Sequence, residues 1–411
     1  MILPAGVAAE ARLLLVGRPL RAFCDSFVAI LLPAYLLALG MGTWEVGVIS
    51  TATLLGSALL TLALGHWGHR FDQRRLLLAA AWLMCVTGLL LAGLSDFWPL
   101  LLVAFIGTIN PSSGDVSVFL PLEHARLSAA AQGEARTTLF SRYTFVGAVC
   151  AALGALATGL PDLLSSFGLD RLSVLRAMFI AYGLVGAVVF LLYRRLPVPA
   201  RHEEASKPVP LGPSKRTVIK LAALFSLDAF AGGLVLNTLL ALWLFERFGL
   251  SLASAGAFFF WAGLLTAVSQ LAAPVVAWRI GLLNTMVFTH IPANLALIAG
   301  ALAPTLELAL ALLLIRALLS QMDVPTRAAF VMAVVTPPER AAAASFTAVP
   351  RSLAAAASPA LGGALFAAGW LAAPLVACGI LKIAYDLAIW RAFRRISLDD
   401  TMRAQPLTQG S

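Results

Sequence analysis

Residues 65–75 read GHWGHRFDQRR, and this basic stretch joins two apolar runs at about 46–65 and 76–95. Each run is long enough to cross a bilayer, because ~20 apolar residues in a helix span ~30 Å of hydrocarbon. Short basic turns between such runs are typical of the cytoplasmic side of membrane proteins. The stretch therefore predicts two adjacent membrane-spanning helices.

The same pattern of apolar runs continues through the 411 residues of the chain. The composition is 60% hydrophobic and 12% charged, with a mean hydropathy of +0.91, whereas a water-soluble domain carries roughly 25% charged residues. We therefore expect an all-α membrane protein. Twelve spans are predicted, at about 20–41, 46–65, 76–95, 98–122, 137–159, 174–193, 218–244, 251–273, 282–303, 305–327, 341–368 and 371–390.

A long polar stretch divides these spans into two sets of six. It carries charged residues and several prolines, a composition typical of flexible linkers. The predicted organisation is an N-terminal six-helix bundle over 1–193, a cytoplasmic linker over 194–217, a C-terminal six-helix bundle over 218–395 and a cytoplasmic tail over 396–411.

Short segments of the first set recur in the second, about two hundred residues on. Gly114-Asp115-Val116 matches Met322-Asp323-Val324, and the segment from Thr138 to Arg142 matches the one from Thr347 to Arg351. Internal repeats of this kind are typical of secondary transporters, whose two halves surround a central path.

The basic residues set the expected orientation. If both termini are cytoplasmic, twenty-one of the 29 Lys and Arg fall in cytoplasmic segments, three fall outside and five lie within spans. Since cytoplasmic loops carry the excess of Lys and Arg, we predict that both termini are cytoplasmic, in a plasma or inner membrane. The formal charge of +9 follows from these loops, so nucleic-acid binding is not expected.

The 65–75 stretch resembles the signature loop of the major facilitator superfamily, whose pattern runs G-x-L-a-D-r-x-G-r-k. Gly65, Arg70 and Arg74 match it, while His69 stands at the acidic position and Asp72 at the second glycine. With twelve spans, a linker and a duplication, the chain is identified as a member. The resemblance implies two pseudo-symmetric bundles, alternating access, and a loop charge network that closes the cytoplasmic side, in which Asp72 would replace the missing acid. The alternative role for the loop is that of a basic anchor at the cytoplasmic face only.

By this resemblance, spans 1, 4, 7 and 10 line the cavity. Each of these spans carries one aspartate, namely Asp25, Asp115, Asp228 or Asp323. An ionised carboxylate inside the membrane is costly unless it is paired with a base or faces a water-filled cavity. We expect all four in the cytoplasmic third of the bilayer, with Asp115 paired to Arg142 and Asp323 to Arg351. Three roles stay open for the pairs: a cytoplasmic gate, a proton or substrate site, and structural packing.

Other polar residues give further expectations. Glu123 at the end of span 4 is either a proton acceptor helped by His124 or a solvated helix end, and Arg327 flanks span 10. His290 is expected to be a hydrogen-bonded packing residue. Lys382 and Asp386, four residues apart, are expected to pair along one helix face.

Prolines beside two of the aspartates predict bends in their spans. Asn110-Pro111 precedes Asp115 in span 4, and Pro325 follows Asp323 in span 10. Proline removes a backbone hydrogen bond and permits a helix to bend there. Such bends would help one half rock against the other.

The sequence contains no G-x-x-x-x-G-K-[ST] loop for nucleotide binding. It also contains no nucleophile–base set or metal-ligand cluster, so we expect neither an enzyme nor a cofactor or metal. The leading hypothesis is a monomeric secondary transporter that moves a small organic solute by proton-coupled efflux. Proton-coupled uptake of a metabolite is the alternative, followed by a non-transporting membrane receptor.

Overall fold

The computed structural model describes residues 10–112, 118–131, 133–197 and 211–394, and every regular element within these ranges is a helix. Lipid offers the backbone no hydrogen-bond partner. Apolar runs therefore form helices, in which the backbone N–H and C=O groups bond to one another. The first half comprises α1 (Ala11–Ala38), α2 (Thr43–Trp67), η1 (Gly68–Arg70), α3 (Gln73–Gly93), α4 (Phe97–Ile106), α5 (Phe119–Ala130), α6 (Gly133–Ala157), α7 (Leu160–Ser166) and α8 (Arg171–Tyr193). The second comprises α9 (Lys215–Gly233), α10 (Asn237–Phe248), α11 (Leu252–Ile280), α12 (Leu282–Ala301), α13 (Leu306–Ser320), α14 (Asp323–Val334), η2 (Pro337–Glu339), α15 (Arg340–Ala357), α16 (Pro359–Ala367) and α17 (Ala373–Phe393). The all-α prediction is confirmed.

Ten of the twelve predicted spans coincide with stretches that are long and apolar enough to cross a membrane within the described residues. The two others, 98–122 and 341–368, fall on shorter or less apolar helices, namely α4 with α5 and α15 with α16. Both are interrupted, which shortens each apolar segment. The chain is an integral, multi-pass membrane protein.

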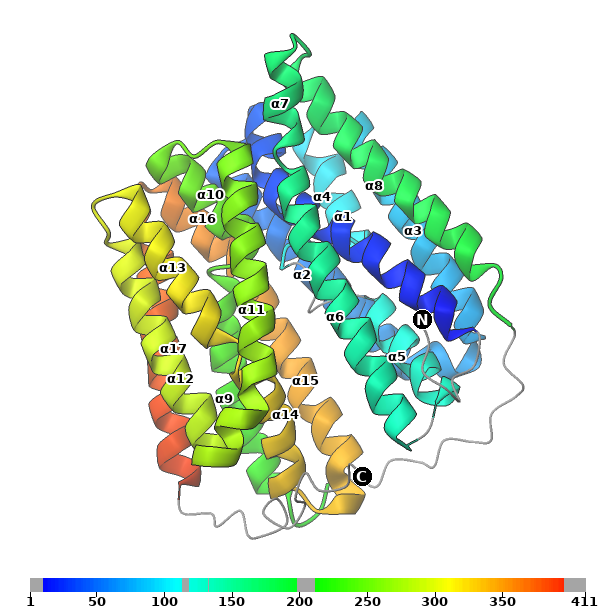
Figure 1. Cartoon of the computed structure of the whole chain (residues 1–411), viewed down its shortest axis with the longest axis vertical. Coiled ribbons are helices and arrows are strands. Elements are labelled where there is room, and N and C mark those ends of the chain that lie inside the picture. Colours follow the sequence, from blue (N-terminus) through cyan, green and yellow to red (C-terminus); the bar gives the residue numbers. More distant parts are fainter. Residues whose placement is uncertain (1–9, 113–117, 132, 198–210, 395–411) are drawn as a thin grey trace, which may run out of the picture.

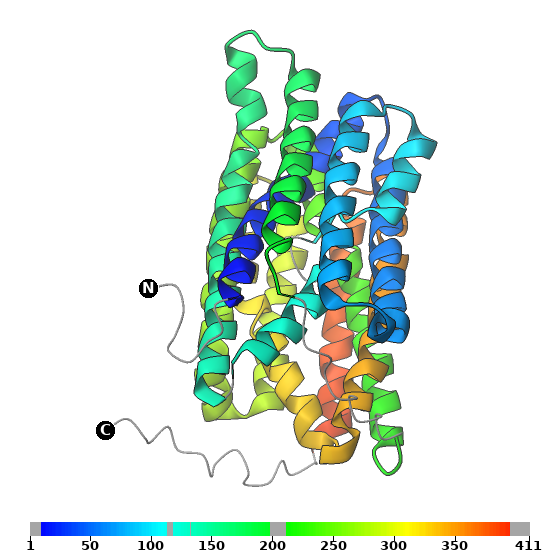
Figure 2. The same cartoon turned by 90° about the vertical axis from the view of Figure 1, so that its right-hand side faces the viewer.

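The two halves lie side by side (Figure 1), the first on the right and the second on the left. Figure 2 shows the helices of both halves running roughly parallel to the long axis of the molecule. One end of the molecule carries the turns at 68–72 and 335–339, and α8 ends and α9 begins there; we call it the linker end. The opposite end is called the far end. The domain boundaries stay a prediction, although α9 begins three residues before the expected start of the second bundle at 218.

Several spans are divided into two helices. In span 4, α4 ends at Ile106, four residues before Asn110-Pro111, and α5 begins only at Phe119. In span 10, α13 ends at Ser320 and α14 begins at Asp323, two residues before Pro325. The predicted bends are therefore present, and they are full interruptions of the helix. Interrupted helices expose backbone groups, which is tolerated where protein or a wet cavity surrounds them.

The halves contact each other closely toward the far end. Gly47 of α2 faces α16 so tightly that a Cβ atom there would lie 2.7 Å from the Pro359 carbonyl oxygen and 2.8 Å from the Gly363 Cα. Two further contacts are hydrogen bonds, from the Ala253 N–H to Asp162 and from the Ala360 N–H to the Thr51 hydroxyl, both of 2.9 Å. Small residues permit such close approach of helices in membranes. The far end is therefore shut.

At the linker end, Glu339 holds the start of α9 against the turn before α15. Its carboxylate accepts hydrogen bonds from the Gly212 N–H, from the Ser214 N–H (3.1 Å) and from the Thr336 hydroxyl (2.8 Å). Hydrogen bonds from the Ser214 hydroxyl, the Gly212 N–H and the Thr336 hydroxyl lower the pKa of Glu339 from 4.5 to about 2. Residues 212–214, expected to be part of a flexible linker, are thus attached to the second half.

We expect Glu339→Gln to lower the melting temperature at neutral pH, and we expect this difference from the parent protein to become smaller as the pH is lowered. A lowered folded-state pKa stabilises the fold above the unfolded value, and this contribution is lost as pH falls from 4.5 toward about 2. Thermal unfolding of the detergent-purified chain between pH 7 and pH 3 measures the difference. A difference that stays constant over this range would show that the charge of Glu339 is unimportant.

Candidate functional site

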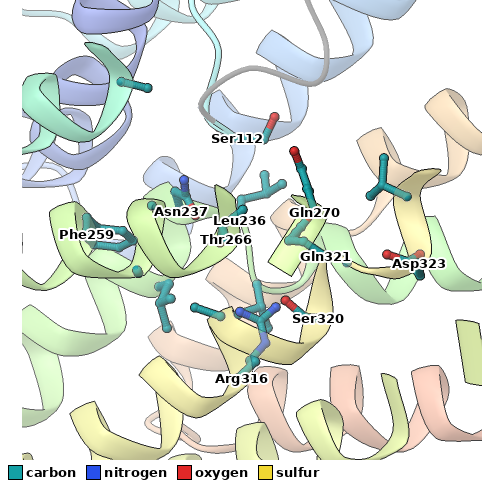
Figure 3. A pocket seen from close by; sticks show the side chains of 18 of the residues that line it. Ser112, Leu236, Asn237, Phe259, Thr266, Gln270, Arg316, Ser320, Gln321 and Asp323 are labelled. Carbon is teal, nitrogen blue, oxygen red and sulfur yellow. The ribbon is translucent and has the colours of Figure 1, made fainter. Parts of the chain in front are cut away.

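A cavity of about 490 Å³ lies between the two halves. It is lined from the first half by α1 and α6 and from the second by α9, α10, α11, α13 and α14, among other elements. Polar side chains gather around it (Figure 3), among them Ser112, Asn237, Gln270, Ser320 and Gln321. Its size is that of a site for a small molecule, since such sites measure about 300–1,000 Å³.

A second hollow of about 730 Å³ continues from the first toward the linker end. The two share Thr144, Ala148, Ala267 and Gln270 among their lining residues. The second hollow is then lined by Ser128 of α5 and residues of α6 between 136 and 148 on one side, and by Pro325 of α14 on the other. The central cavity is therefore reached from the linker end, while the far end is shut.

A network of four charged side chains from the second half borders the cavity. Asp228 of α9 accepts a hydrogen bond of 2.5 Å from the Lys382 Nζ and another of 3.0 Å from the Arg327 Nη1. The same Arg327 nitrogen lies 3.2 Å from the Asp323 carboxylate, one helical turn away. All four side chains line the cavity. Two carboxylates and two cations balance, which lowers the cost of burying them.

Two predicted pairings differ from these contacts. Asp323 was expected to pair with Arg351, but its ion-pair partner is Arg327, four residues on in the same helix. Lys382 was expected to pair with Asp386, but it reaches Asp228 on α9. The rotation of each helix about its axis decides which neighbour a side chain reaches. When a span is apolar on most of its sides, its sequence does not show which side faces which neighbour. Arg351 also lines the cavity.

Asp386 instead pairs with His290. The His290 Nδ1 lies 2.9 Å from the Asp386 carboxylate, and both side chains are buried between α12 and α17. This fits the expectation of a hydrogen-bonded packing residue. The cavity also reaches His290, so the imidazole connects the pair with the polar path.

The first half contains its own buried ion pair between its first and fourth spans. The Arg21 Nη2 of α1 lies 2.5 Å from both carboxylate oxygens of Glu123 on α5. The hydroxyls of Tyr143 and Tyr193 donate to the same carboxylate, and the Arg21 guanidinium lies 4.0 Å from the centre of the Phe119 ring. Arg21 is 1% exposed and Glu123 is fully buried. The expectation that Glu123 is a solvated helix end is therefore wrong.

We expect Glu123→Gln to destabilise the fold by about 3–5 kcal/mol, because it leaves the Arg21 guanidinium buried without its counter-charge. Thermal or denaturant unfolding of the detergent-purified chain measures the loss. Glu246→Gln is the matched control, since Glu246 is exposed at the far end of α10. Equal effects of the two substitutions would contradict the structural role of the Arg21–Glu123 pair.

The remaining predicted cavity residues lie as follows. Asp25 is buried at 6% exposure in the middle of α1, deeper than expected because α1 begins at Ala11 instead of near residue 20. The lining of the cavity does not include it. Asp115 lies outside the described residues, so its expected pairing with Arg142 of α6 stays a prediction.

The signature loop is held within the first half. Gly65 is in the last turns of α2, His69 and Arg70 belong to η1, and Asp72 caps α3 by accepting the Arg74 N–H at 2.9 Å. The Arg74 side chain donates to the Arg194 carbonyl oxygen. Asp72 also lies 4.0 Å from the Arg126 guanidinium of α5. The acid thus contacts a base of its own half, and these contacts do not bridge to the second half.

Sequence reasoning missed two basic residues of the interior. Arg21 stands at the edge of predicted span 1, where the charge count places it in a loop; the early start of α1 brings it inside. Arg316 is one of five basic residues within the predicted spans, but no acidic residue lies three or four positions from it to draw attention to it. In Figure 3 its guanidinium extends from α13 toward Thr266 and Ser320.

Comparison with known proteins agrees with this architecture. Among curated proteins, the uncharacterized membrane protein YJR124C of Saccharomyces cerevisiae is 23% identical over 394 residues, which cover 87% of this chain and 88% of its own. Among solved structures, the nucleoside transporter NupG has a TM-score of 0.72 at 14% identity, covering 94% of this chain and 100% of its own. An inward-facing, unoccupied bacterial homologue of the human lysosomal transporter Spinster has a TM-score of 0.70 at 15% identity, covering 94% and 97%.

The two solved structures share the fold. A sequence profile of the Major Facilitator Superfamily matches residues 14–322, which is most of the chain. Membership of this family accounts for the internal repeat, for the cavity between the two halves and for the signature loop. The chain is a membrane transporter that belongs to the major facilitator superfamily.

Proposed function

We propose that the protein is a secondary active transporter that moves a small organic solute by alternating access and uses protons as its energy source. The observation that carries the proposal is the cavity at the join of the halves, which reaches the linker end and is shut at the far end. A solute bound there can leave at one end only until the halves rock. This is the geometry that alternating access requires.

The contacts at the far end suit a reversible seal. They consist of glycine against backbone, as at Gly47 and Gly363, and of few hydrogen bonds. Such surfaces separate without leaving buried charges unpaired. Rocking of the halves would open this end and close the cavity at the other.

Proton coupling is proposed at Asp228 and Asp323. Both carboxylates line the cavity, and each lies within ion-pair distance of Arg327. A proton on Asp228 would remove its attraction for Arg327 and Lys382, so the network would rearrange with the protonation state. Rearrangement of charges that border the cavity is a direct route from proton binding to a change in solute affinity.

We propose efflux by antiport, with the linker end and both termini in the cytoplasm of a plasma or inner membrane, and a monomeric carrier. Uptake by symport is the alternative. These two directions predict opposite proton movements, so one experiment separates them.

The test uses the full chain in proteoliposomes that contain a pH-sensitive dye, with a panel of small organic compounds added outside. Antiport makes the interior more alkaline when a transported compound enters, because protons leave in exchange, whereas symport makes it more acidic. Empty liposomes and liposomes with Asp228→Asn are the controls. Proton movement that is equal with and without the protein, for every compound, would contradict the proposal.

A further inference from the structure

We infer that the transported solute is an organic anion with an apolar body, and that Arg316 holds its charged group, with Arg18 and Arg351 nearby in the cavity wall. This inference rests on the proposed transport function and names the substrate class. The solute would carry a carboxylate, sulfonate or phosphate group, all of which a guanidinium recognises through charge-assisted hydrogen bonds.

The first observation is the charge of the cavity wall. Leaving Arg351 out of the count, four basic side chains and two carboxylates of the described residues line the cavity, an excess of two positive charges when His290 is counted as neutral. The bases are Arg18, Arg316, Arg327 and Lys382, and the acids are Asp228 and Asp323. A cleft with low-dielectric walls focuses such a field and concentrates ions of the opposite sign. The cavity therefore favours anions.

The second observation is that both carboxylates are already neutralised. Lys382 and Arg327 contact Asp228 at 2.5 and 3.0 Å, and Arg327 also lies 3.2 Å from Asp323. An organic cation would have to displace one of these bases, which would then lie unpaired in a low-dielectric site. Binding of a cation at these acids is therefore disfavoured.

The third observation is the position of Arg316. It lies half-buried on α13, and among the described residues no carboxylate lies within ion-pair distance of its guanidinium. Its Nε is buried and has no hydrogen-bond partner in the same part of the chain. A desolvated cation of this kind is costly on its own. A bound anion would satisfy both the charge and the nitrogen.

The remaining residues of the cavity wall determine the polarity and size of the uncharged part of the solute. Phe258, Phe259, Leu236 and Leu240 supply apolar surface, and Asn237 is a polar neighbour. With a volume of about 490 Å³ the cavity accepts a molecule with one ring system or a short chain. A charged head at Arg316 and an apolar part against the phenylalanines describe an amphipathic anion.

The test measures the charge preference of the cavity and works before the solute is identified. Ser320, one helical turn from Arg316, is replaced by cysteine in the full chain after the four native cysteines are changed to alanine. The purified protein in detergent is treated with methanethiosulfonate reagents that carry either a sulfonate or a trimethylammonium group. The ratio of the two modification rates cancels any change in the reactivity of the thiol itself.

We expect this ratio to exceed that of a free cysteine in solution by about tenfold, in favour of the sulfonate. Arg316→Gln should lower it by about threefold or more, and Arg316→Lys should retain most of it, which separates loss of charge from loss of folding. Arg391→Gln is the matched control, because Arg391 is exposed at the linker end of α17. A ratio at or below the solution value, or one that Arg316→Gln leaves unchanged, would overturn the inference.

Competition identifies the charged group of the ligand. 4-Phenylbutyrate, its amide and 4-phenylbutylamine share one body and differ only in charge. The carboxylate should slow modification of Ser320→Cys by neutral methyl methanethiosulfonate, and Arg316→Gln should abolish this protection. Protection by the amine in place of the carboxylate would overturn the anion assignment. Neither readout needs transport, so failure of the liposome assay with an intact sulfonate preference would reject the proposed function alone.

Discussion

Gly47→Val is expected to hold the far end of the protein open and to reduce transport by about tenfold or more. A Cβ atom at Gly47 would lie 2.7 Å from the Pro359 carbonyl oxygen and 2.8 Å from the Gly363 Cα, and both neighbours are backbone atoms that cannot turn aside. Overpacking of this kind costs about 1–3 kcal/mol. Because the clash exists only when the far end is shut, the cost shifts the equilibrium toward the state in which that end is open.

Distance measurements between spin labels at Phe167 and Leu302 test this shift. Both side chains are exposed at the far end, one in each half. The label pair should show a longer distance in Gly47→Val than in the parent protein. Gly93→Val is the matched control, since a Cβ atom there meets nothing within 4 Å. Identical distance distributions in all three proteins would show that the glycine contact does not seal the far end.

Asp228→Asn is expected to destabilise the protein by about 3–5 kcal/mol and to abolish proton-coupled transport. The substitution removes the carboxylate that both Lys382 and Arg327 contact, so two buried cations keep only Asp323 as counter-charge. Loss of one partner from a buried ion network costs far more than loss of the whole network. The melting temperature in detergent should therefore fall markedly.

The double variant Asp228→Asn with Lys382→Gln tests the cause. It restores the charge balance of the network, so we expect it to recover most of the lost stability while transport stays absent. Lys382→Gln alone should be the milder single change, because Arg327 still pairs with Asp228. If the double variant is as unstable as the sum of the singles, charge balance is not what Asp228 contributes.

The sequence predicted the class, most of the spans and bends near Asn110-Pro111 and Pro325, where the structure has full interruptions of the helix. These features depend on local properties, namely the length of apolar runs and the chemistry of proline. Hydropathy underestimated α1, which begins at Ala11, because Arg18 and Arg21 interrupt its apolar run and the pairing of Arg21 with Glu123 cannot be seen in a local window.

The partners within the site were harder to predict. Asp323 pairs with Arg327 in place of Arg351, and Lys382 pairs with Asp228 in place of Asp386. Each pairing depends on how helices distant in sequence are rotated against one another. Residue type and spacing showed that charges enter the membrane in both repeats, but only the packed structure shows which of them meet.

The ion pairs of the two halves differ in their surroundings. Arg21 and Glu123 are enclosed by tyrosines and face away from water, whereas Asp228 and its bases border the cavity. Under the proposed coupling, the second bundle carries the charges that respond to protons, whereas the buried pair of the first bundle holds that bundle together. A chimera that joins the second bundle of this chain to the first bundle of a relative should inherit the ion requirement of this chain.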